Sequence, residues 1–478
     1  MTPVTSAAGQ HFALFGLGGS GLATARALLA GGARVTAWDD GEDARATAVA
    51  AGIAVADLRR ADWSGFTALV LSPGVPLTHP APHWSVDLAR QAGVEVIGDI
   101  DLFCRERAKL APEAPFVAVT GTNGKSTTTA LVAHLFRTAG WDVQMGGNIG
   151  TAVLDLEPPS DERIHVLELS SFQIELAPSL KPSLGILTNI TPDHIDRHGT
   201  LERYAAIKES LIERSEWSLV GVDDHHSRAI HDRAVQRAEA TAAAGGSPGP
   251  QYAVSVRDGS RGGVHLAGTK IVMAIEAGRA RLLGDLAGTQ TLRGAHNAQN
   301  ACFAAGAADC WELWANDAQA PVALIQHGLQ TFEGLPHRME TMAKRGRVLF
   351  VNDSKATNAE AAAQSLRTFA DIHWIVGGLA KEGGLSSLWP EFGRVRKAYL
   401  IGASTEAFAA EIGDRLPVER CGTLERAVAM AAADAARSEA AEPVVLLAPA
   451  CASYDQFKNF EARGEAFRTL VQGLGSDP

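Results

Sequence analysis

The chain has 478 residues with a formal net charge of -11, and 46% of its residues are apolar and 20% charged. This length exceeds what one hydrophobic core supports, and the composition excludes a disordered or fibrous protein, so we expect two to four domains. The negative charge, with no Lys/Arg cluster to counter it, argues against a nucleic-acid partner, and no run of apolar residues is long enough to predict a membrane span.

The five cysteines indicate a reducing compartment. Their number is odd and no two form a C-x-x-C pair, which argues against both a disulfide framework and a zinc site. Residues 1–15 lack the basic and apolar regions of an export signal. We therefore expect a cytoplasmic protein.

Short apolar runs alternate with Ala/Leu-rich helical stretches along almost the whole chain, a pattern typical of parallel sheets covered by helices. The predicted class is α/β. Charge and proline interrupt the pattern near residues 105–115 and 333–336, so we predict three domains: 1–110, 111–334 and 335–478. The first and last are expected to be Rossmann-like, and the central one a P-loop domain with a mainly parallel sheet.

The first predicted strand, His11–Phe15, runs into the glycine-rich turn Gly16-Leu-Gly-Gly-Ser-Gly21, and Asp39 follows the next strand. This is a dinucleotide-binding fingerprint, in which a pyrophosphate lies on a helix N-terminus and an acidic residue contacts a ribose or base. An NAD-dependent dehydrogenase is one interpretation. A uridine diphosphate group would use the same backbone features.

The strongest motif is Thr120-Gly-Thr-Asn-Gly-Lys-Ser-Thr127, between the apolar strand Phe116–Thr120 and a helical run over 128–138. Glycines let backbone N–H groups approach phosphate oxygens, Lys125 can reach the terminal phosphates, and the Ser126 hydroxyl can ligate magnesium. The spacing is two residues shorter than the common P-loop form. The strand–helix context nevertheless predicts ATP binding.

Two further strands are expected to end in polar residues. The strand over 164–170 carries Glu168 near its carboxyl end, where α/β sheets place ligands, and the apolar strand that begins at Leu184 ends in a turn with Asp193 and His194. Each could ligate a hard cation, and His194 could also contact a phosphoryl oxygen. Lys208 lies in a predicted helix, and its spacing alone indicates only a solvated lysine.

With these motifs the chain resembles the Mur ligases of peptidoglycan synthesis. The resemblance runs through all three predicted domains: Ser72-Pro-Gly74, residues 120–126, Gly147-Asn-Ile-Gly150, residues 168–173, Asp193-His-Ile-Asp-Arg197, His296-Asn297, His337-Arg338, Asn352-Asp-Ser-Lys-Ala-Thr-Asn358 and residues 449–460. The segment 353–357 lacks the pattern of members that add a diamino acid or a dipeptide. The resemblance therefore implies a member that joins D-glutamate to UDP-N-acetylmuramoyl-L-alanine. We also expect the protein to be a monomer.

The resemblance also implies roles for individual residues. Ser126 and Glu168 would hold one of two Mg²⁺ ions, and His194 and a carbamylated Lys208 the second, while Lys125, His194 and Lys208 would serve catalysis. ATP would be bound by Gly121, Thr122, Asn123, Gly124, Lys125, Ser126, Thr127, Asn297, Arg338 and Asp353. The UDP substrate would be bound by Ser20, Asp39, Gly74 and Asn148, and D-glutamate by Lys355, Thr357, Lys381, Ser453 and Phe460. Tyr454 departs from the aliphatic residue expected in that pocket.

A nucleotide-hydrolysing switch is a further alternative to a ligase. Such a protein would turn over ATP without an amino acid, whereas a ligase should release phosphate only when both of its other substrates are present. The dehydrogenase does not account for the phosphate loop, for the cluster of Glu168, Asp193 and His194, or for the 353–358 segment. Another member of the same family that adds a different amino acid is a further alternative.

Overall fold

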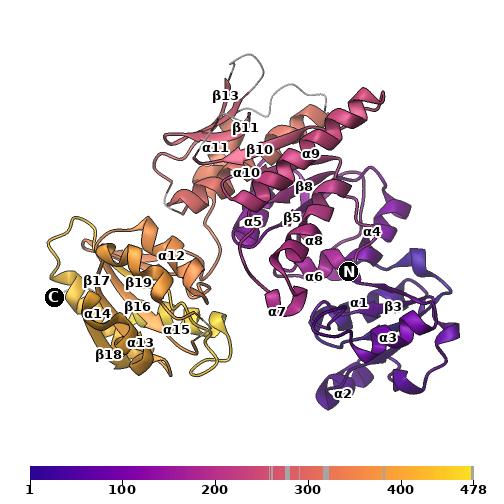
Figure 1. Cartoon of the computed structure of the whole chain (residues 1–478), viewed down its shortest axis with the longest axis horizontal. Coiled ribbons are helices and arrows are strands. Elements are labelled where there is room, and N and C mark those ends of the chain that lie inside the picture. Colours follow the sequence, from indigo (N-terminus) through magenta and orange to yellow (C-terminus); the bar gives the residue numbers. More distant parts are fainter. Residues whose placement is uncertain are drawn as a thin grey trace. The chain divides into compact units, whose positions relative to one another are not determined.

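The computed structural model describes residues 1–257, 259, 262–274, 280–289, 291–315, 322–380 and 383–474 (Figure 1). This part of the chain contains three β-sheets and forms two compact units. The first unit comprises Met1–Ala287 and Gln299–Leu329, and the second comprises Gly288–Ala298 and Gln330–Pro478. Parallel strand pairs dominate all three sheets, which confirms the predicted α/β class.

The first sheet has the strand order β2-β1-β3-β4 and is parallel throughout. Successive side chains of a strand point to opposite faces, and in β1 Phe12 and Leu14 join one hydrophobic cluster while Ala13 and Phe15 join another. Both faces are thus buried, as expected for a parallel sheet. Its strands and helices are β1 (His11–Phe15), α1 (Gly19–Ala30), β2 (Arg34–Trp38), α2 (Glu42–Ala50), β3 (Ala68–Leu71), α3 (Trp84–Gln91), β4 (Glu95–Ile97) and α4 (Asp99–Leu110).

The second sheet, also in the first unit, has the order β13-β12-β11-β10-β9-β8-β5-β7-β6. It is parallel from β6 to β11 and continues into antiparallel β12 and β13. Its strands are β5 (Phe116–Thr120), β6 (Asp142–Gly147), β7 (Arg163–Glu168), β8 (Leu184–Leu187), β9 (Trp217–Gly221), β10 (Gln251–Ser255), β11 (Gly263–Ala267), β12 (Lys270–Ala274) and β13 (Ala280–Asp285). The helices that follow in this region are α5 (Lys125–Thr138), α6 (Ser171–Glu175), α7 (Ile195–His198), α8 (Leu201–Arg214), α9 (His225–Ala243), α10 (Ala295–Ala315) and α11 (Val322–Thr331).

The third sheet forms the second unit and has the order β14-β15-β19-β16-β17-β18, with only β14 antiparallel to its neighbour. In β16, Trp374 and Val376 pack into one hydrophobic cluster and Ile375 into the cluster on the opposite face. The strands are β14 (Glu340–Arg345), β15 (Val348–Asn352), β16 (Ile372–Gly377), β17 (Val395–Ile401), β18 (Val418–Gly422) and β19 (Val444–Leu447). The helices are α12 (Ala359–Thr368), α13 (Thr405–Ile412), α14 (Leu424–Ala436) and α15 (Phe460–Gly473).

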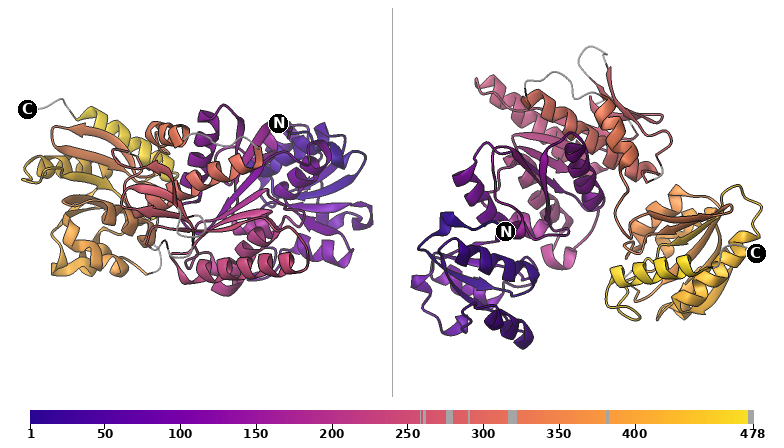
Figure 2. Two further views of the ribbon diagram at one scale, coloured as in Figure 1. Left: turned by 90° about the horizontal axis from the view of Figure 1, so that it is seen from above. Right: turned by 180° about the vertical axis from the view of Figure 1, so that it is seen from behind.

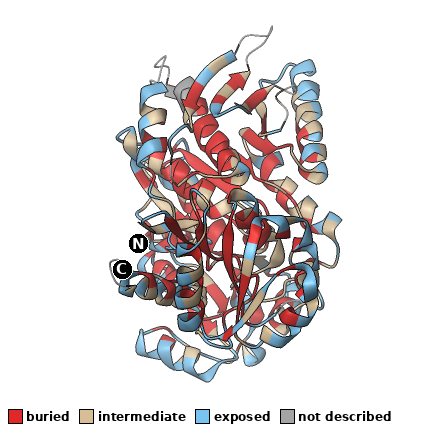
Figure 3. Ribbon diagram, turned by 90° about the vertical axis from the view of Figure 1, so that its left-hand side faces the viewer, coloured by how far each residue is buried: buried red, intermediate tan, exposed pale blue. Residues whose placement is uncertain are grey.

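Helices cover the faces of the sheets, as two further views show (Figure 2). Buried residues concentrate in the strands and on the inner sides of these helices, whereas the outer helix faces are exposed (Figure 3). All five cysteines are buried and none forms a disulfide. In the part of the chain that is described, no helix combines the length and the apolar character that a bilayer crossing requires.

Candidate active site

The turn between β5 and α5 is built around two glycines in the left-handed region of backbone space. Gly121 has φ 144° and Gly124 has φ 83°. A Cβ atom at Gly121 would lie 1.9 Å from Thr188 Oγ1, and one at Gly124 would lie 2.6 Å from Asn300 Oδ1. The turn therefore requires glycine for conformation and for space, and it leads straight into a helix N-terminus, which favours a bound anion.

The loop that follows β8 fixes this turn from the side. Asn189 Oδ1 accepts a hydrogen bond from the Asn123 backbone N–H at 2.9 Å, and Asn189 Nδ2 donates to the Asn123 carbonyl at 3.0 Å. Thr188 Oγ1 donates to the same carbonyl at 2.7 Å, and Thr122 Oγ1 donates to the Thr191 carbonyl at 3.1 Å. Thr188 and Asn189 were not predicted as site residues. Their position directly after an apolar strand was the available signal.

The side chains of the first turn of α5 complete the loop. Lys125 Nζ donates to the carbonyls of Gly121 and Thr122 at 3.1 and 2.7 Å, so the amine lies over its own loop. Ser126 is buried at the start of the helix and Thr127 is half-buried. These residues lie at the helix N-terminus where the motif predicts that phosphate binds.

Glu168 ends β7, the neighbour of β5, and only 2% of its surface is exposed. Its Oε1 accepts a hydrogen bond from Asn148 Nδ2 at 2.9 Å, and its backbone carbonyl accepts one from the Asn148 N–H at 2.8 Å. Its Oε2 is buried and has no hydrogen-bond partner among the described residues. An unpartnered buried carboxylate oxygen is costly in a folded protein and is a suitable ligand for a cation.

His194 lies in the turn after β8, on the other side of β5. It adopts φ 53° and precedes the short helix α7, and its ring contacts Phe172 at a centroid distance of 5.2 Å. Burial lowers the pKa of His194, the nearby Asp193 carboxylate raises it, and the charges of Lys125 and Lys208 lower it further. These interactions place His194 within electrostatic reach of both lysines.

Lys208 is buried, contrary to what its helical spacing alone indicates. Only 1% of the residue is exposed, and its Nζ donates to the Gly121 carbonyl at 2.8 Å and to Thr120 Oγ1 at 3.1 Å. Burial lowers the pKa of the Lys208 amine well below its usual value, and the charge of Lys125 lowers it further. A lysine of α8 thus reaches the start of the phosphate loop.

The donor set at this sheet edge suits magnesium bound together with a phosphate. Among the described residues, no group of three or more His, Cys, Asp and Glu side chains could hold a metal ion. Mg²⁺ needs only one or two protein ligands when phosphate oxygens and water complete its shell. The unpartnered Oε2 of Glu168 and the Ser126 hydroxyl, on neighbouring elements, fit that requirement.

Three of the four predicted UDP-binding residues follow strands of the first sheet, whereas Asn148 follows β6 of the second. Asp39 Oδ2 accepts a hydrogen bond from the Leu17 N–H at 2.6 Å and Asp39 Oδ1 accepts one from the Gly41 N–H at 2.8 Å, so this carboxylate orders the glycine turn. Ser20 lies in the first turn of α1 and lines a small cavity. The Gly74 carbonyl accepts a hydrogen bond from Arg197 at 2.9 Å, which connects this loop to α7.

The other predicted ATP contacts belong to the second unit. Asp353 follows β15, and its Oδ1 accepts a hydrogen bond from the Met339 N–H at 3.1 Å while Oδ2 accepts one from Ser365. Burial raises the pKa of Asp353 to about 6, whereas its hydrogen bonds and the charge of Arg338 act in the opposite direction. Asn297, in the first turn of α10, donates to the Arg293 carbonyl at 3.1 Å.

Three of the predicted amino-acid contacts come from two segments at the carboxyl edge of the third sheet, and a fourth begins α15. Lys355 Nζ lies 4.1 Å from the centre of the Phe460 ring, and the Lys355 carbonyl accepts a hydrogen bond from the Thr357 N–H at 2.7 Å. Ser453 is buried. Lys381 lies outside the described residues. Tyr454 is 72% exposed, so its ring does not fill the space beside Ser453.

Comparison with protein families gives two matches in chain order. Residues 119–308 match the model of the Mur ligase middle domain, and residues 337–451 match that of the Mur ligase glutamate ligase domain. The chain belongs to the Mur ligase family. Curated relatives named UDP-N-acetylmuramoylalanine–D-glutamate ligase include those of Rhizobium meliloti strain 1021, 58% identical over 99% of this chain and 98% of the relative, and of Brucella abortus strain 2308, 54% identical over 99% and 98%.

Solved structures of Mur ligases share the fold. UDP-N-acetylmuramate-alanine ligase MurC from Thermotoga maritima aligns with a TM-score of 0.56 at 16% identity, covering 97% of this Mur ligase and all of that chain. MurF ligase from Thermotoga maritima in complex with ADP aligns with the same score and identity, covering 99% of this chain and all of that one. The family assignment does not favour the dehydrogenase interpretation of the glycine turn.

Proposed function

We propose that this Mur ligase uses ATP to join D-glutamate to UDP-N-acetylmuramoyl-L-alanine. The observation that carries the proposal is the convergence of the phosphate loop, Glu168, His194 and Lys208 at one sheet edge. Relatives that carry the corresponding name align over almost the whole chain at 54% identity or more. Both lines of support point to a ligase that couples a triphosphate to amide formation.

ATP is proposed to lie with its phosphates on the loop 121–127 and to be contacted from the second unit by Asn297, Arg338 and Asp353. The known ADP complex of the structurally similar MurF ligase supports a nucleotide site in this fold. When bound, two Mg²⁺ ions would neutralise charge on the transferring phosphoryl group. Ser126 and Glu168 would hold one, and His194 and Lys208 the second.

Lys208 is proposed to act as a carbamate. A protonated amine cannot ligate a cation, but carbamylation would convert this buried side chain into an anion beside Glu168 and Lys125. The neutral amine that reacts with carbon dioxide is favoured by the burial described above. The geometry supports the proposal because Lys208 Nζ already reaches the first residue of the loop.

The reaction is proposed to begin with attack of the L-alanyl carboxylate on the γ-phosphorus of ATP, which yields an acyl phosphate and ADP. The D-glutamate amine then attacks the acyl carbon, and the tetrahedral intermediate collapses to amide and phosphate. Lys125 stabilises the charge on the transferring group, and Lys355 and Ser453 contact the carboxylates of D-glutamate. The amine must lose a proton before it attacks, and His194 is one candidate for that base.

The uridine diphosphate is proposed to lie on the first sheet, with Ser20, Asp39 and Gly74 on one side and Asn148 next to the metal site. We further propose three domains with boundaries near 110 and 335, since each of the three sheets falls within one of these ranges. We also propose that the protein is a monomer and that it is cytoplasmic; the five buried cysteines, none of which forms a disulfide, support the second of these proposals.

Isotope transfer tests this chemistry directly. The proposal predicts that substrate labelled with ¹⁸O in its L-alanyl carboxylate passes one labelled oxygen to the released phosphate, because the carboxylate oxygen stays with phosphorus when the amide forms. Mass spectrometry of the phosphate measures this. Unlabelled phosphate formed alongside amide product would contradict the acyl phosphate, and phosphate release without D-glutamate would indicate a nucleotide-hydrolysing switch instead.

A further inference from the structure

A buried cation, Arg463, lies beside the proposed amino-acid site. Arg463, in the first turns of α15, is only 1% exposed. Among the described residues no carboxylate forms an ion pair with it, and Asp455, whose charge acts on it from a distance, is exposed and accepts a hydrogen bond from the Ala403 N–H at 2.9 Å. Burial lowers the pKa of Arg463 to about 10, so the guanidinium remains charged at neutral pH.

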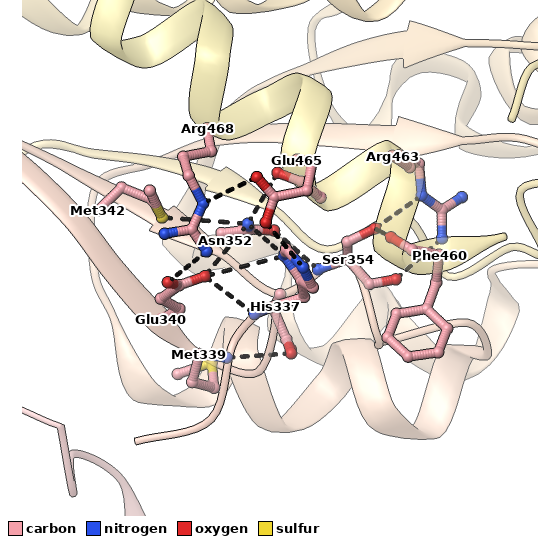
Figure 4. A network of polar contacts seen from close by, with 12 residues as sticks. His337, Met339, Glu340, Met342, Asn352, Ser354, Phe460, Arg463, Glu465 and Arg468 are labelled. Carbon is pink, nitrogen blue, oxygen red and sulfur yellow. Dashed lines mark hydrogen bonds and ion pairs between the residues drawn. The ribbon is translucent and has the colours of Figure 1, made fainter. Parts of the chain in front are cut away.

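The guanidinium joins the two chain segments that carry Lys355 and Ser453. Arg463 Nε donates to Ser354 Oγ at 3.0 Å, and Nη2 donates to the carbonyls of Ser354 and Cys451 at 2.9 and 3.1 Å. The Ser354 hydroxyl in turn donates to the Phe460 carbonyl at 2.8 Å (Figure 4). These segments follow the paired strands β15 and β19, so Arg463 fixes their spacing at one sheet edge.

The third nitrogen of the guanidinium, Nη1, differs from the other two. Nη1 is buried, makes no hydrogen bond to the described residues, and lies 3.3 Å from the position that a Cβ of Gly378 would occupy. The adjacent Leu379 pairs with Ala452 in an isolated bridge, next to Ser453. An unpaired buried charge is costly, and the carbonyls around Arg463 are neutral. The guanidinium therefore has no directly contacting counter-ion within the part of the chain that the structure describes.

We propose that Arg463 is a positioning and specificity residue of the amino-acid pocket, which holds the Lys355 and Ser453 segments together and favours an amino acid that carries a second carboxylate. The inference rests on the proposed function and deepens it. A dicarboxylate bound against Lys355 supplies the negative charge that the protein omits, whereas an amino acid with a neutral side chain supplies only one carboxylate.

Steady-state kinetics with D-glutamate and with D-glutamine, at saturating ATP and UDP-N-acetylmuramoyl-L-alanine, tests the assignment. Arg463→Met should raise the KM for D-glutamate about tenfold and reduce the preference for D-glutamate over D-glutamine by a similar factor. Arg463→Lys keeps the charge and should retain most of that preference. Arg468→Met is the matched control on the same helix, where the guanidinium already pairs with Glu340 and Glu465, and it should leave the preference unchanged.

An unchanged preference for D-glutamate over D-glutamine in Arg463→Met would overturn the proposal. Equal losses of activity with both amino acids in Arg463→Met and in Arg463→Lys would also overturn it, because they would indicate a purely structural role. If Arg463→Met does not fold, Ser354→Ala replaces it as the test. That change removes the hydroxyl that orients the guanidinium, and it should raise the KM for D-glutamate a few-fold without raising the KM for ATP. A KM for D-glutamate equal to that of the wild type would contradict the proposal. A wild-type enzyme that does not use D-glutamate would instead refute the proposed function.

Discussion

Lys208 and Asp353 are two side chains whose charged forms burial disfavours. The amine of Lys208 has a pKa well below its usual value, and the carboxyl of Asp353 has a pKa raised to about 6. Each lies after or beside a strand end, at a position that the proposed reaction uses. Shifted pKa values of this kind are common at functional sites, where stability is given up for chemistry.

Replacement of Asp353 by Asn should stabilise the protein and impair its activity. Burial raises the folded-state pKa of Asp353 above its usual value of 3.8, so stability falls as the pH rises from about 4 through 6 and stays lower above that range. Because Asn cannot ionise, it avoids this loss, and the free energy of unfolding should rise by up to about 3 kcal/mol at neutral pH. Urea unfolding at pH 7.5 measures the gain, and the KM for ATP should rise at the same time.

Asp371 is the matched control, because its side chain is as little exposed as that of Asp353 but its pKa is shifted in the opposite direction. Although burial acts to raise its pKa, hydrogen bonds from Ser438 and Arg396 outweigh burial and lower it. Asp371→Asn should therefore destabilise the protein at neutral pH. A loss of stability in Asp353→Asn comparable to that of Asp371→Asn would show that the ionised Asp353 carboxylate is favourable after all.

Replacement of Lys208 by Ala should lower kcat by more than about 100-fold, because it removes the proposed carbamate ligand. Added acetate or formate should restore part of the rate by supplying a carboxylate in the space that the side chain leaves. Lys109→Ala is the control, since Lys109 Nζ also donates to a threonine hydroxyl and a carbonyl, at 2.9 Å each, but is exposed. Normal rates in Lys208→Ala would eliminate the carbamate.

The segments that follow β5, β7 and β8 owe their proximity to strand order. β5 lies between β7 and β8 in a parallel sheet, so the phosphate loop, Glu168 and the His194 turn leave the same edge. The hydrogen bonds from Asn189 and Thr188 then hold the phosphate loop in one conformation before any ligand binds. Such preorganisation reduces the cost of ordering the loop around a phosphate.

Gly124→Ala should weaken ATP binding at least about tenfold, because it combines left-handed strain of about 1 kcal/mol with a collision against Asn300. Gly9→Ala provides the control: Gly9 has φ 76° but no atom within 4 Å of an added Cβ. In thermal unfolding Gly9→Ala should lose stability from strain alone, and Gly124→Ala should lose more because of the added collision. If Gly124→Ala binds ATP as tightly as Gly9→Ala does, as measured by calorimetry, the loop does not form the phosphate site.

Local patterns predicted the strands better than they predicted the contacts between them. The strand Phe116–Thr120 has the predicted bounds, and Glu168 lies at the carboxyl end of its strand as expected, although that strand spans Arg163–Glu168 and not 164–170. These features depend on apolar runs and the residues that interrupt them. The burial of Lys208 depends on how α8 packs against the sheet, and the role of Asn189 depends on which strand lies beside β5. Arg463 likewise acquires its partners only when β15 and β19 pair.

The chain divides into two compact units. It enters the second unit at Gly288, returns to the first at Gln299, and enters the second again at Gln330. The proposed ATP contacts are shared between them, with the phosphate loop in one unit and Asp353 in the other. We therefore expect substrate binding to bring the units into a closed arrangement. Small-angle X-ray scattering should show a smaller radius of gyration with a non-hydrolysable ATP analogue, UDP-N-acetylmuramoyl-L-alanine and D-glutamate. An unchanged scattering profile would count against closure.

The most direct measurement of the central claim is phosphate release from ATP with each substrate omitted in turn and with a panel of D- and L-amino acids. A ligase of the proposed kind releases phosphate at its full rate only when ATP, Mg²⁺, UDP-N-acetylmuramoyl-L-alanine and D-glutamate are all present, in equal amount to the amide formed. Phosphate release at the same rate without an amino acid would contradict the claim that this sheet edge couples ATP to one specific amide bond. Release at the same rate with every amino acid in the panel would contradict it as well.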